Sequence, residues 1–355
     1  MRAAVAEGEG KLVVREFDGP GEPGPGEIRV AVRAAGVCHT DVGVVEGYLM
    51  QGPPPVIPGH EPMGVVDALG EGVAGVRVGQ RVAVDPLVVC GTCTRCLAGQ
   101  PHICERWRAG VDGYGSLGRA RPGGFAEYLL APARNAVPLP DSMTDAEGAI
   151  LVDACATSYH AVRRAGVRPG ETVLLLGLGG LGQASLRFLR LVSGLRIIAV
   201  DTVEHKLELA GQAGADVLVH AGEEDVGAVA RRETAGAGVD AVVEHTGNPA
   251  AAESGLAALR MGGRMVVAGC SSGAFSVPMV RCCLDEINVL GSHGFTHGEI
   301  LEIVGLIDAG VVRFDDLVSH RLALSELPYA LEMLSNADVA AREKPVRIVI
   351  DRLEG

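Results

Sequence analysis

The pattern of hydrophobic and polar positions changes near residue 150, and this change divides the chain into two kinds of structure. Before that point, short apolar runs are broken by glycine and proline, as in residues 28–32, 64–68 and 81–84. Such runs are typical of strands in an antiparallel sheet or a small barrel. The sequence therefore predicts a β-rich N-terminal region with few helices.

After residue 153 the apolar runs alternate with segments of helical periodicity. The expected strands cover residues 172–176, 196–200, 217–219, 241–244 and 264–268. Helices are expected between the first of these strands, from about residue 180 and from about residue 203. This alternation is the pattern of a parallel sheet covered by helices on both faces. The fold class is therefore predicted as α/β.

The last part of the chain mixes helical patterns with one final strand. Helices are expected at residues 297–309 and 328–335, and a strand at residues 346–350. We expect this segment to return to the first region. The predicted organisation is a β-rich domain of residues 1–153 and 293–355, and a doubly wound parallel-sheet domain of residues 154–292.

Length, composition and charge narrow the class of protein. A chain of 355 residues exceeds what one hydrophobic core usually serves, and 48% hydrophobic with 21% charged residues is typical of a globular protein. The excess of 44 acidic over 31 basic side chains, a net charge of -13, disfavours a nucleic-acid partner. The sequence has neither a signal peptide at its N-terminus nor an apolar window long enough to span a membrane. The expected location is the cytoplasm, with no membrane partner.

Nine cysteines are the first sign of chemistry, because four of them lie within fifteen residues. This cluster has the spacing of metal ligands and consists of Cys90, Cys93, Cys96 and Cys104. Four thiolates suit a tetrahedral zinc with no open position, which shapes a loop and contributes folding energy. The alternative is four free thiols that happen to be neighbours. The cysteines expected to be small buried side chains without a ligand are Cys155, Cys270, Cys282 and Cys283.

A glycine-rich turn follows the strand at residues 172–176 and precedes a helix. Its sequence is Gly177-Leu178-Gly179-Gly180-Leu181-Gly182, which matches the dinucleotide-binding pattern GxGxxG. Gly177 permits the tight turn, Gly179 lets the backbone approach a pyrophosphate, and Gly182 allows close packing of helix and strand. The next strand ends at Asp201, whose carboxylate can accept both ribose hydroxyls and repels a 2'-phosphate. We therefore expect NAD as the cofactor, the alternative being an ordinary glycine-rich turn.

Two further segments contain metal-ligand residue types, Cys38-His39-Thr40-Asp41 and Pro58-Gly59-His60-Glu61. Together with the four-cysteine loop and the GLGGLG turn, their order resembles the zinc-dependent alcohol dehydrogenases of the medium-chain dehydrogenase/reductase family. The resemblance extends from the first strand to the last. It implies a GroES-like catalytic domain, a Rossmann coenzyme domain, and a C-terminal segment that returns to the catalytic domain.

The resemblance implies a second, catalytic zinc, which makes two zinc ions per chain. Cys38 and His60 match the family's ligands, and the third ligand falls on Asp153, where many relatives have cysteine. Glu61 matches a residue that binds the metal transiently or lies just behind it. The alternative for Asp153 is the N-cap of a helix at residues 154–162.

Other positions match residues around the zinc and the coenzyme. Thr40 matches the hydroxyl that begins a proton relay from the substrate, and Asp41 matches the carboxylate that orients His60. Gly43 stands where many relatives end the relay with histidine, so that water, the coenzyme ribose or another side chain such as His293 must complete it. The remaining matches to coenzyme contacts are His39, Thr157, Lys206, Thr246 and Arg347.

The implied reaction is hydride transfer between NAD and a small-molecule alcohol or carbonyl compound. The loops at residues 46–58 and 107–118 are apolar and rich in glycine or proline, which favours a secondary, hydrophobic or cyclic alcohol. The alternatives are a polyol or amino-alcohol dehydrogenase, a zinc-free quinone or enoyl reductase, and a non-catalytic zinc and nucleotide redox sensor. The resemblance also implies a homodimer or homotetramer joined at a sheet edge near residues 275–289.

Overall fold

The computed structural model describes residues 1–110 and 113–353. Contacts within the chain divide it into unit 1, which comprises Met1–Asp153 and Thr296–Gly355, and unit 2, Ala154–Phe295. Residues 111 and 112 of the expected substrate loop at 107–118 lie outside the described residues. The assignment of a catalytic and a coenzyme domain to 1–153 with 293–355 and to 154–292 stays a prediction.

Strand β3 (Glu27–Val37) organises unit 1, because it pairs antiparallel with three other strands. Its partners are β4 (Glu61–Leu69), β8 (Tyr128–Pro132) and β17 (Arg347–Arg352). Side chains alternate between buried and more exposed over the first half of β3, as a strand with one face on a core requires. Since β17 is the last strand of the described residues, the C-terminal segment pairs with the sheet of unit 1.

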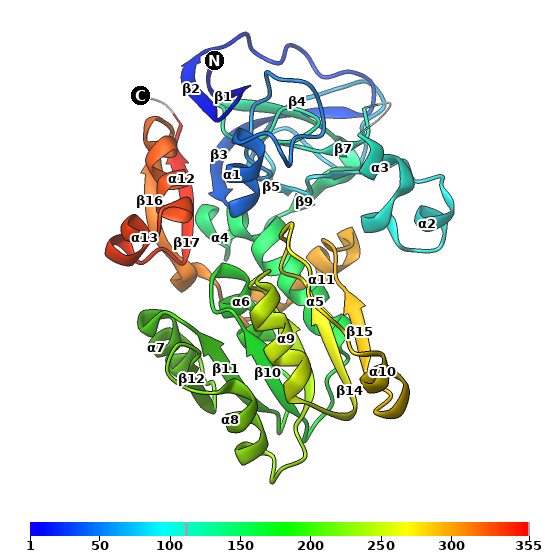
Figure 1. Cartoon of the computed structure of the whole chain (residues 1–355). Helices are drawn as coiled ribbons and strands as arrows, with labels where there is room; N and C mark the ends of the chain where they lie inside the picture. The colour runs from blue at the N-terminus through cyan, green and yellow to red at the C-terminus, as the bar shows by residue number, and fades with distance from the viewer. Residues whose placement is uncertain (111–112, 354–355) are drawn as a thin grey trace. The chain divides into compact units, whose positions relative to one another are not determined.

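The rest of unit 1 adds strands to this sheet and forms two separate two-stranded sheets and several short helices (Figure 1). Its other strands are β1 (Arg2–Gly8), β2 (Lys11–Glu16), β5 (Arg81–Val84), β6 (Leu87–Val88), β7 (Gly115–Ser116), β9 (Ala136–Pro138) and β16 (Val318–Ala323). Its helices are α1 (His39–Val45), α2 (Thr94–Leu97), α3 (Glu105–Ala109), α4 (Asp145–Ile150), α11 (His297–Asp308), α12 (Leu327–Ser335) and α13 (Ala337–Glu343). The main core contains apolar side chains of β3, β4, β17 and α12.

Unit 2 is a sheet of six parallel strands in the order β12-β11-β10-β13-β14-β15 (Figure 1). The strands are β10 (Thr172–Leu176), β11 (Arg196–Asp201), β12 (Val217–His220), β13 (Val239–Glu244), β14 (Leu259–Val267) and β15 (Asn288–Gly291). The helices are α5 (Ala156–Ala165), α6 (Gly180–Leu189), α7 (Glu204–Gln212), α8 (Val226–Glu233), α9 (Pro249–Ala258) and α10 (Met279–Leu284).

The strand order of unit 2 reverses beside β10, since β11 and β12 lie on one side of it and β13 to β15 on the other. Helix α6 packs against α5 and α7, whereas α8 packs against α9, which gives two layers. These are the features of a doubly wound Rossmann sheet, whose ligands bind where the strand order reverses. The predicted α/β fold is confirmed.

The region before residue 150 has few helices, as expected: α1 to α4 have at most seven residues each, which is too short for helical periodicity to be visible. One local expectation was wrong. Of the four cysteines expected to be buried, only Cys155 is buried, whereas Cys270, Cys282 and Cys283 are exposed. Cys282 and Cys283 lie on α10, which has no buried residue in this chain. No helix in the described part of the chain has the length and apolar character to span a membrane.

Candidate active site

The register of three strands brings distant residues to one edge of the unit 1 sheet. In the antiparallel pair β3 and β4, Gly36 lies opposite Glu61, and in the pair β17 and β3, Val37 lies opposite Ile348. Cys38 follows the end of β3, His60 precedes the start of β4, and Arg347 begins β17. Because ends of antiparallel neighbours coincide, these residues meet although they are far apart in the sequence.

Asp41 holds the first two of these residues in place. Its buried carboxylate accepts hydrogen bonds from the backbone N–H of Cys38 at 2.9 Å and of Gly59 at 3.1 Å. The same carboxylate lies 3.1 Å from His60 Nδ1, so Nδ1 carries the hydrogen that it donates. The expected contact between Asp41 and His60 is therefore present. It leaves Nε2, the atom that can bind a metal, on the other side of the ring.

Asp153 enters the site from a π-helical turn, Leu151–Cys155, between α4 and α5. Helix α5 begins at Ala156, so the alternative role of Asp153 as N-cap of a helix at 154–162 is wrong. A π-helical turn inserts one extra residue per turn, which changes the direction of a side chain, and such turns are frequent at functional sites. Asp153 Oδ2 lies 3.5 Å from His60 Nε2.

The donor atoms of four predicted site residues converge. One ligand atom from each of Cys38, His60, Glu61 and Asp153 lies within 4.8 Å of the others. His60 Nε2 and Glu61 Oε1 are buried and have no hydrogen-bond partner among the described residues. A buried polar atom normally has a partner, and a set of sulfur, nitrogen and oxygen donors suits zinc. The residues therefore fit a zinc ion.

The charges around these donors agree with a cation site. Burial raises the pKa of the Cys38 thiol, and it raises the pKa of Glu61 to about 7. Burial alone would lower the pKa of His60, but Asp41 and Asp153 raise it well above its ordinary value. A divalent cation favours the thiolate, the carboxylates and the neutral imidazole, so it would reverse all of these shifts.

Arg347 forms a buried ion pair with Glu61, which sequence reasoning missed. The Arg347 side chain is 4% exposed, and its Nη2 donates to Glu61 Oε2. Gly36 makes room for this pair, because a Cβ at that position would overlap the Glu61 carboxylate. Glu61 thus has one oxygen on Arg347 and the other directed toward His60 Nε2, at 3.9 Å. A role of Arg347 at the coenzyme phosphates stays a prediction.

Helix α1 carries Thr40 and His39 in its first turn, directly after Cys38. One helical turn later, Gly43 is covered by the loop that follows the helix. A Cβ on Gly43 would lie 2.6 Å from Leu49 Cδ1 and 2.8 Å from Tyr48 Cζ. Leu49 and Tyr48 therefore fill the space beside Gly43, where the resemblance would place a relay histidine. The expected alternative at His293 lies in unit 2, after β15, and stays a prediction.

The two expected substrate loops contact each other. Arg119 Nε donates to the carbonyl of Leu49 at 2.8 Å, and the N–H of Ser116 donates to Gln51 Oε1 at 2.9 Å. Arg119 also lies over the Trp107 ring, 5.7 Å from its centre. These contacts tie the loop at 46–58 to the segment that begins at Trp107.

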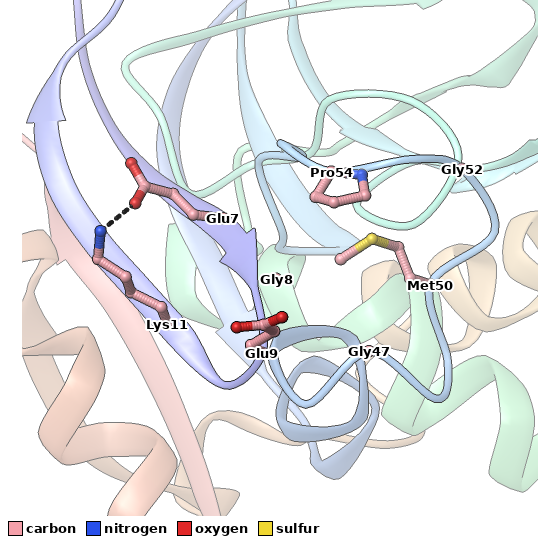
Figure 2. Close-up of a pocket in the computed structure, with 8 residues that line it drawn as sticks. All are labelled: Glu7, Gly8, Glu9, Lys11, Gly47, Met50, Gly52 and Pro54. Atoms are coloured by element: carbon pink, nitrogen blue, oxygen red, sulfur yellow. Dashed lines mark hydrogen bonds and ion pairs between the residues drawn. The ribbon is translucent and has the colours of Figure 1, made fainter.

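A cavity of about 680 Å³ lies between the loop at residues 46–58 and the β1–β2 hairpin (Figure 2). Its lining consists of Glu7, Gly8, Glu9, Lys11, Gly47, Met50, Gly52 and Pro54. Figure 2 shows Lys11 and Glu7 joined by an ion pair at its rim, with an N–O distance of 2.5 Å. Four of the lining residues belong to the expected substrate loop at 46–58, but none is a predicted metal ligand, proton-relay residue or coenzyme contact.

The four cysteines of the predicted structural site come together in unit 1. Sγ distances are 3.5 Å for Cys90 and Cys104 and 3.9 Å for both Cys90 with Cys96 and Cys93 with Cys104. Tetrahedral zinc with Zn–S bonds of about 2.3 Å requires Sγ atoms about 3.8 Å apart. The cluster therefore has the size of a closed zinc site.

Backbone N–H groups favour the thiolate form of one cysteine in this cluster, which is the form that binds a cation. N–H groups of Thr92 and Cys93 donate to Cys90 Sγ at 3.4 and 3.3 Å, and they lower the pKa of Cys90 to about 6. Burial raises the pKa of Cys96 to about 12, a value that a bound cation would lower. Trp107 packs beside these sulfur atoms and links the cluster to the substrate loops.

In unit 2 the glycines of the GLGGLG turn differ in their surroundings. Gly177 has a φ of +85°, which favours glycine, and the turn that it makes leads from β10 into α6. A Cβ on Gly182 would overlap the carbonyl oxygen of Gly177, whereas Gly179 has open space beside it. A pyrophosphate can therefore approach at Gly179, next to the free amides of Gly180 and Leu181 in the first turn of α6.

Asp201 ends β11 beside this turn. Its Oδ2 accepts a hydrogen bond from the N–H of Leu178 at 2.7 Å, and its Oδ1 accepts from Thr202 at 2.8 Å and Val203 at 3.0 Å. The carboxylate is thus fixed by backbone amides with lone pairs left for a ribose. Lys206 lies in the first turn of α7, and Thr157 is buried in the first turn of α5.

The segment after β13 contains polar residues that sequence reasoning missed. Thr246 was expected near the coenzyme. The two residues that precede it, Glu244 and His245, also form side-chain hydrogen bonds. Glu244 Oε1 accepts a hydrogen bond from the Thr246 hydroxyl, and His245 Nε2 lies 2.7 Å from Ser185 Oγ. Burial lowers the pKa of His245 to about 4, so this imidazole is neutral. Two adjacent polar residues at the end of a buried strand were the available signal.

Family comparisons agree with this geometry. Residues 24–141 match the family model for the alcohol dehydrogenase GroES-like domain, and residues 180–309 match the model for zinc-binding dehydrogenases. The chain is 35% identical to an alcohol dehydrogenase of Geobacillus stearothermophilus over 88% of this chain and 90% of the relative. It is 32% identical to an NAD-dependent alcohol dehydrogenase of Saccharolobus solfataricus, over 97% and 99%. It is 31% identical to an erythritol/L-threitol dehydrogenase of Mycolicibacterium smegmatis, over 95% and 94%.

Solved structures extend the likeness to the whole chain. An alcohol dehydrogenase of Aeropyrum pernix has a TM-score of 0.88 with 32% identity, over 99% of this chain and 100% of that chain. The RspB alcohol dehydrogenase of Escherichia coli CFT073, solved with NADH, has a TM-score of 0.88 with 26% identity, over 99% of both chains.

Proposed function

Because the chain belongs to the zinc-dependent alcohol dehydrogenases of the medium-chain dehydrogenase/reductase family, we propose that it transfers a hydride between a secondary, hydrophobic or cyclic alcohol and NAD. The reaction interconverts the alcohol and a ketone or aldehyde. One observation carries the proposal: the buried, unpartnered Nε2 of His60 faces the ligand atoms of Cys38, Glu61 and Asp153. This arrangement supports a catalytic metal, because a non-catalytic zinc and nucleotide sensor would be expected to have lost one of these ligands.

Cys38, His60 and Asp153 hold the catalytic zinc in this proposal, and Glu61 is available as a further ligand. Zinc in such a site acts as a Lewis acid that polarises the substrate oxygen and lowers the pKa of its hydroxyl group. The second zinc of the chain is held by the four-cysteine cluster. Both donor sets have the types that zinc prefers.

Residues of the chain itself orient the metal ligands and accept the substrate proton. Asp41 fixes the tautomer of His60, and Arg347 restrains Glu61. Thr40 carries a hydroxyl within the turn that follows Cys38, and this hydroxyl accepts the proton that the alcohol loses as it passes its own proton on to the next group of the relay. Gly43 has no side chain and is covered by Leu49 and Tyr48. The proton released by the alcohol therefore reaches solvent without a group at position 43.

The coenzyme binds to the turn Gly177–Gly182 of unit 2 with its pyrophosphate at the N-terminus of α6. Asp201 accepts the ribose hydroxyls and selects NAD over NADP, because a 2'-phosphate would face a carboxylate. His39, Thr157, Lys206, Thr246 and Arg347 complete the proposed coenzyme contacts.

Two substitutions test the catalytic zinc. Cys38→Ser and His60→Ala remove a ligand and should abolish alcohol oxidation, followed as NADH formation. Binding of NADH, followed by its fluorescence, should stay nearly unchanged because neither Cys38 nor His60 is among the proposed coenzyme contacts. Cys270→Ser, which changes an exposed thiol, is the matched control and should keep full activity. Full activity in either ligand variant would overturn the assignment.

Substrate class is the second part of the proposal, and one relative favours a rival. The dehydrogenase of Mycolicibacterium smegmatis is named for the polyols erythritol and L-threitol, which makes a polyol or amino alcohol the alternative. The apolar side chain of Leu49, which covers Gly43 one helical turn after Thr40, supports a hydrophobic alcohol instead. A panel of cyclic, aliphatic secondary, polyol and amino alcohols with NAD separates them. Higher kcat/KM for the polyols would reverse the choice.

We further propose that two copies of the chain associate through β15. This strand is the last of the six-stranded sheet, so its outer edge offers backbone hydrogen-bonding groups to a second copy. Next to it, α10 exposes Met279 at 86%, Val280 at 60% and Leu284 at 67%. An exposed apolar group of this kind is typical of an interface.

Light scattering after gel filtration tests this association. Val280→Asp should shift the protein toward monomers, because it places a charge in the apolar group. Val311→Asp, at an exposed valine of unit 1, is the matched control and should leave the mass unchanged. An unchanged oligomer in Val280→Asp would refute the proposed interface.

A further inference from the structure

Glu244 is the last residue of β13, and its side chain is buried, with 1% exposure. A single carboxylate oxygen, Oε1, accepts three hydrogen bonds. The donors are the N–H and the hydroxyl of Thr246 and the N–H of Gly247, the last at 2.9 Å. A buried carboxylate with three donors to one oxygen fixes the turn that leads from β13 into α9.

The same residue connects this turn to the neighbouring strand. The backbone carbonyl of Glu244 accepts hydrogen bonds from the N–H of Ala268 at 2.9 Å and of Gly269 at 3.0 Å, just after β14. Ser271 Oγ donates to the carbonyl of Gly247 at 2.6 Å. A Cβ on Gly269 would lie 2.7 Å from Glu244 Oε2, so this position requires glycine. Glu244 therefore joins the carboxyl ends of β13 and β14.

These ends lie beside the glycine-rich turn. β13 is the neighbour of β10, and a Cβ on Gly177 would lie 2.8 Å from Thr246 Cγ2. The strands β10 and β11, with Asp201, belong to the half of a Rossmann sheet that binds the adenosine end of a dinucleotide. β13 and β14 belong to the opposite half, which binds the other nucleotide. The turn held by Glu244 thus borders the nicotinamide half of the site.

We propose that Glu244 is a positioning residue for the nicotinamide half of the coenzyme, acting through Thr246 and Gly247. The inference rests on the proposed NAD-dependent function. Glu244 Oε1 holds the Thr246 hydroxyl and two amides in one orientation, so that the surface beside Gly177 is formed before the coenzyme binds. A site that is already formed binds more tightly than one that must be ordered on binding.

The test compares NADH with ADP, which contains the adenosine and pyrophosphate parts only. In Glu244→Ala the three donors lose their acceptor, and we expect the Kd for NADH to rise about 10-fold, within the range of about 5- to 100-fold that the loss of a buried acceptor implies. The Kd for ADP, measured by calorimetry, should change less than about 2-fold because the first half of the sheet is intact. Glu244→Gln keeps one oxygen as acceptor and should recover most of the NADH affinity.

Two further measurements keep the outcome clear. Glu224→Ala, at an exposed glutamate of unit 2, is the matched control and should bind both ligands like the wild type. If Glu244→Ala does not fold, Thr246→Val removes the hydroxyl bond alone, and Thr246→Ser restores it. We expect weaker NADH binding in the valine variant and recovery in the serine variant.

Equal losses of NADH and ADP affinity would show a general structural role and overturn the proposal, as would unchanged NADH binding in Glu244→Ala. Failure of the proposed NAD dependence gives a different result, because the wild-type protein itself would then bind neither NADH nor ADP.

Discussion

Substitution of Asp201 tests the coenzyme site in two independent ways, because this carboxylate has a structural role and a proposed binding role. Asp201→Gly removes one partly buried hydrogen bond, from the N–H of Leu178 at 2.7 Å. It also removes two exposed hydrogen bonds, from the N–H groups of Thr202 and Val203. The first bond involves a charged acceptor and is worth about 1.5–3 kcal/mol, and exposed bonds are worth much less. The expected destabilisation is therefore about 2 kcal/mol.

The corresponding fall in Tm is about 4–8 °C for a unit of this size. The same substitution removes the charge that would face a 2'-phosphate. We expect the ratio of the Kd for NADPH to the Kd for NADH to fall about 10-fold, equivalent to about 1.4 kcal/mol. Melting is followed by calorimetry, and coenzyme binding by fluorescence titration.

Asp201→Asn separates the two effects. An amide oxygen can still accept the Leu178 N–H, so the Tm should fall less than in Asp201→Gly, but the loss of charge should change the coenzyme ratio to a similar extent. Asp225→Asn, at the N-cap of α8, is the matched control and should leave the ratio unchanged. An unaltered ratio in both Asp201 variants would remove this residue from the ribose site.

Three further predictions concern unit 1. Burial raises the pKa of Glu147, whose Oε1 accepts the Phe314 N–H, so wild-type stability should fall as pH rises above about 4.3, the usual pKa of a glutamate, through the raised folded value. Glu147→Gln should abolish this slope in urea unfolding between pH 4 and 8, and an unchanged slope would contradict the assignment. Gly43→Ala should raise KM for the alcohol several-fold by displacing Leu49, at a strain of about 1–3 kcal/mol, with NADH binding unchanged; an unaltered KM would show that the loop is not part of the substrate site. Cys104→Ser should lower the Tm measurably through loss of the structural zinc, and a variant that melts like the wild type would argue against a structural role for this cluster.

Sequence patterns predicted the local features of this protein well. The parallel sheet follows from apolar runs alternating with helical periodicity, and the four-cysteine cluster follows from its spacing, because in both cases the partners are close in the sequence. The different surroundings of Gly177 and Gly182 could be anticipated from the GxGxxG pattern, since each glycine serves a turn or a close contact within a few residues.

Features that depend on distant contacts could not be predicted in this way. Arg347 meets Glu61 across 286 positions of sequence, through the register of β17, β3 and β4. The π-helical turn that directs Asp153 has no recognised sequence signature. The exposed Cys282 and Cys283 show that an apolar residue type alone does not place a side chain in the core.

Polar residues within apolar strands were the signal that sequence reasoning underused. Glu244 ends a strand whose other residues are mostly buried and apolar, and a carboxylate at such a position needs donors nearby. Its hydrogen-bond donors come from the turn that follows β13. Of the residues around this turn, the resemblance had indicated only Thr246. The role of Glu244 in fixing this turn follows only from its hydrogen bonds in the structure.

Zinc content tests the central claim, that the chain has a catalytic zinc at Cys38, His60 and Asp153 in addition to a structural zinc at the four cysteines. Metal analysis of purified protein should give two zinc ions per chain in the wild type. His60→Ala and Cys104→Ser should each retain one, and the double variant none. One or no zinc in the wild type, or two in His60→Ala, would contradict the account.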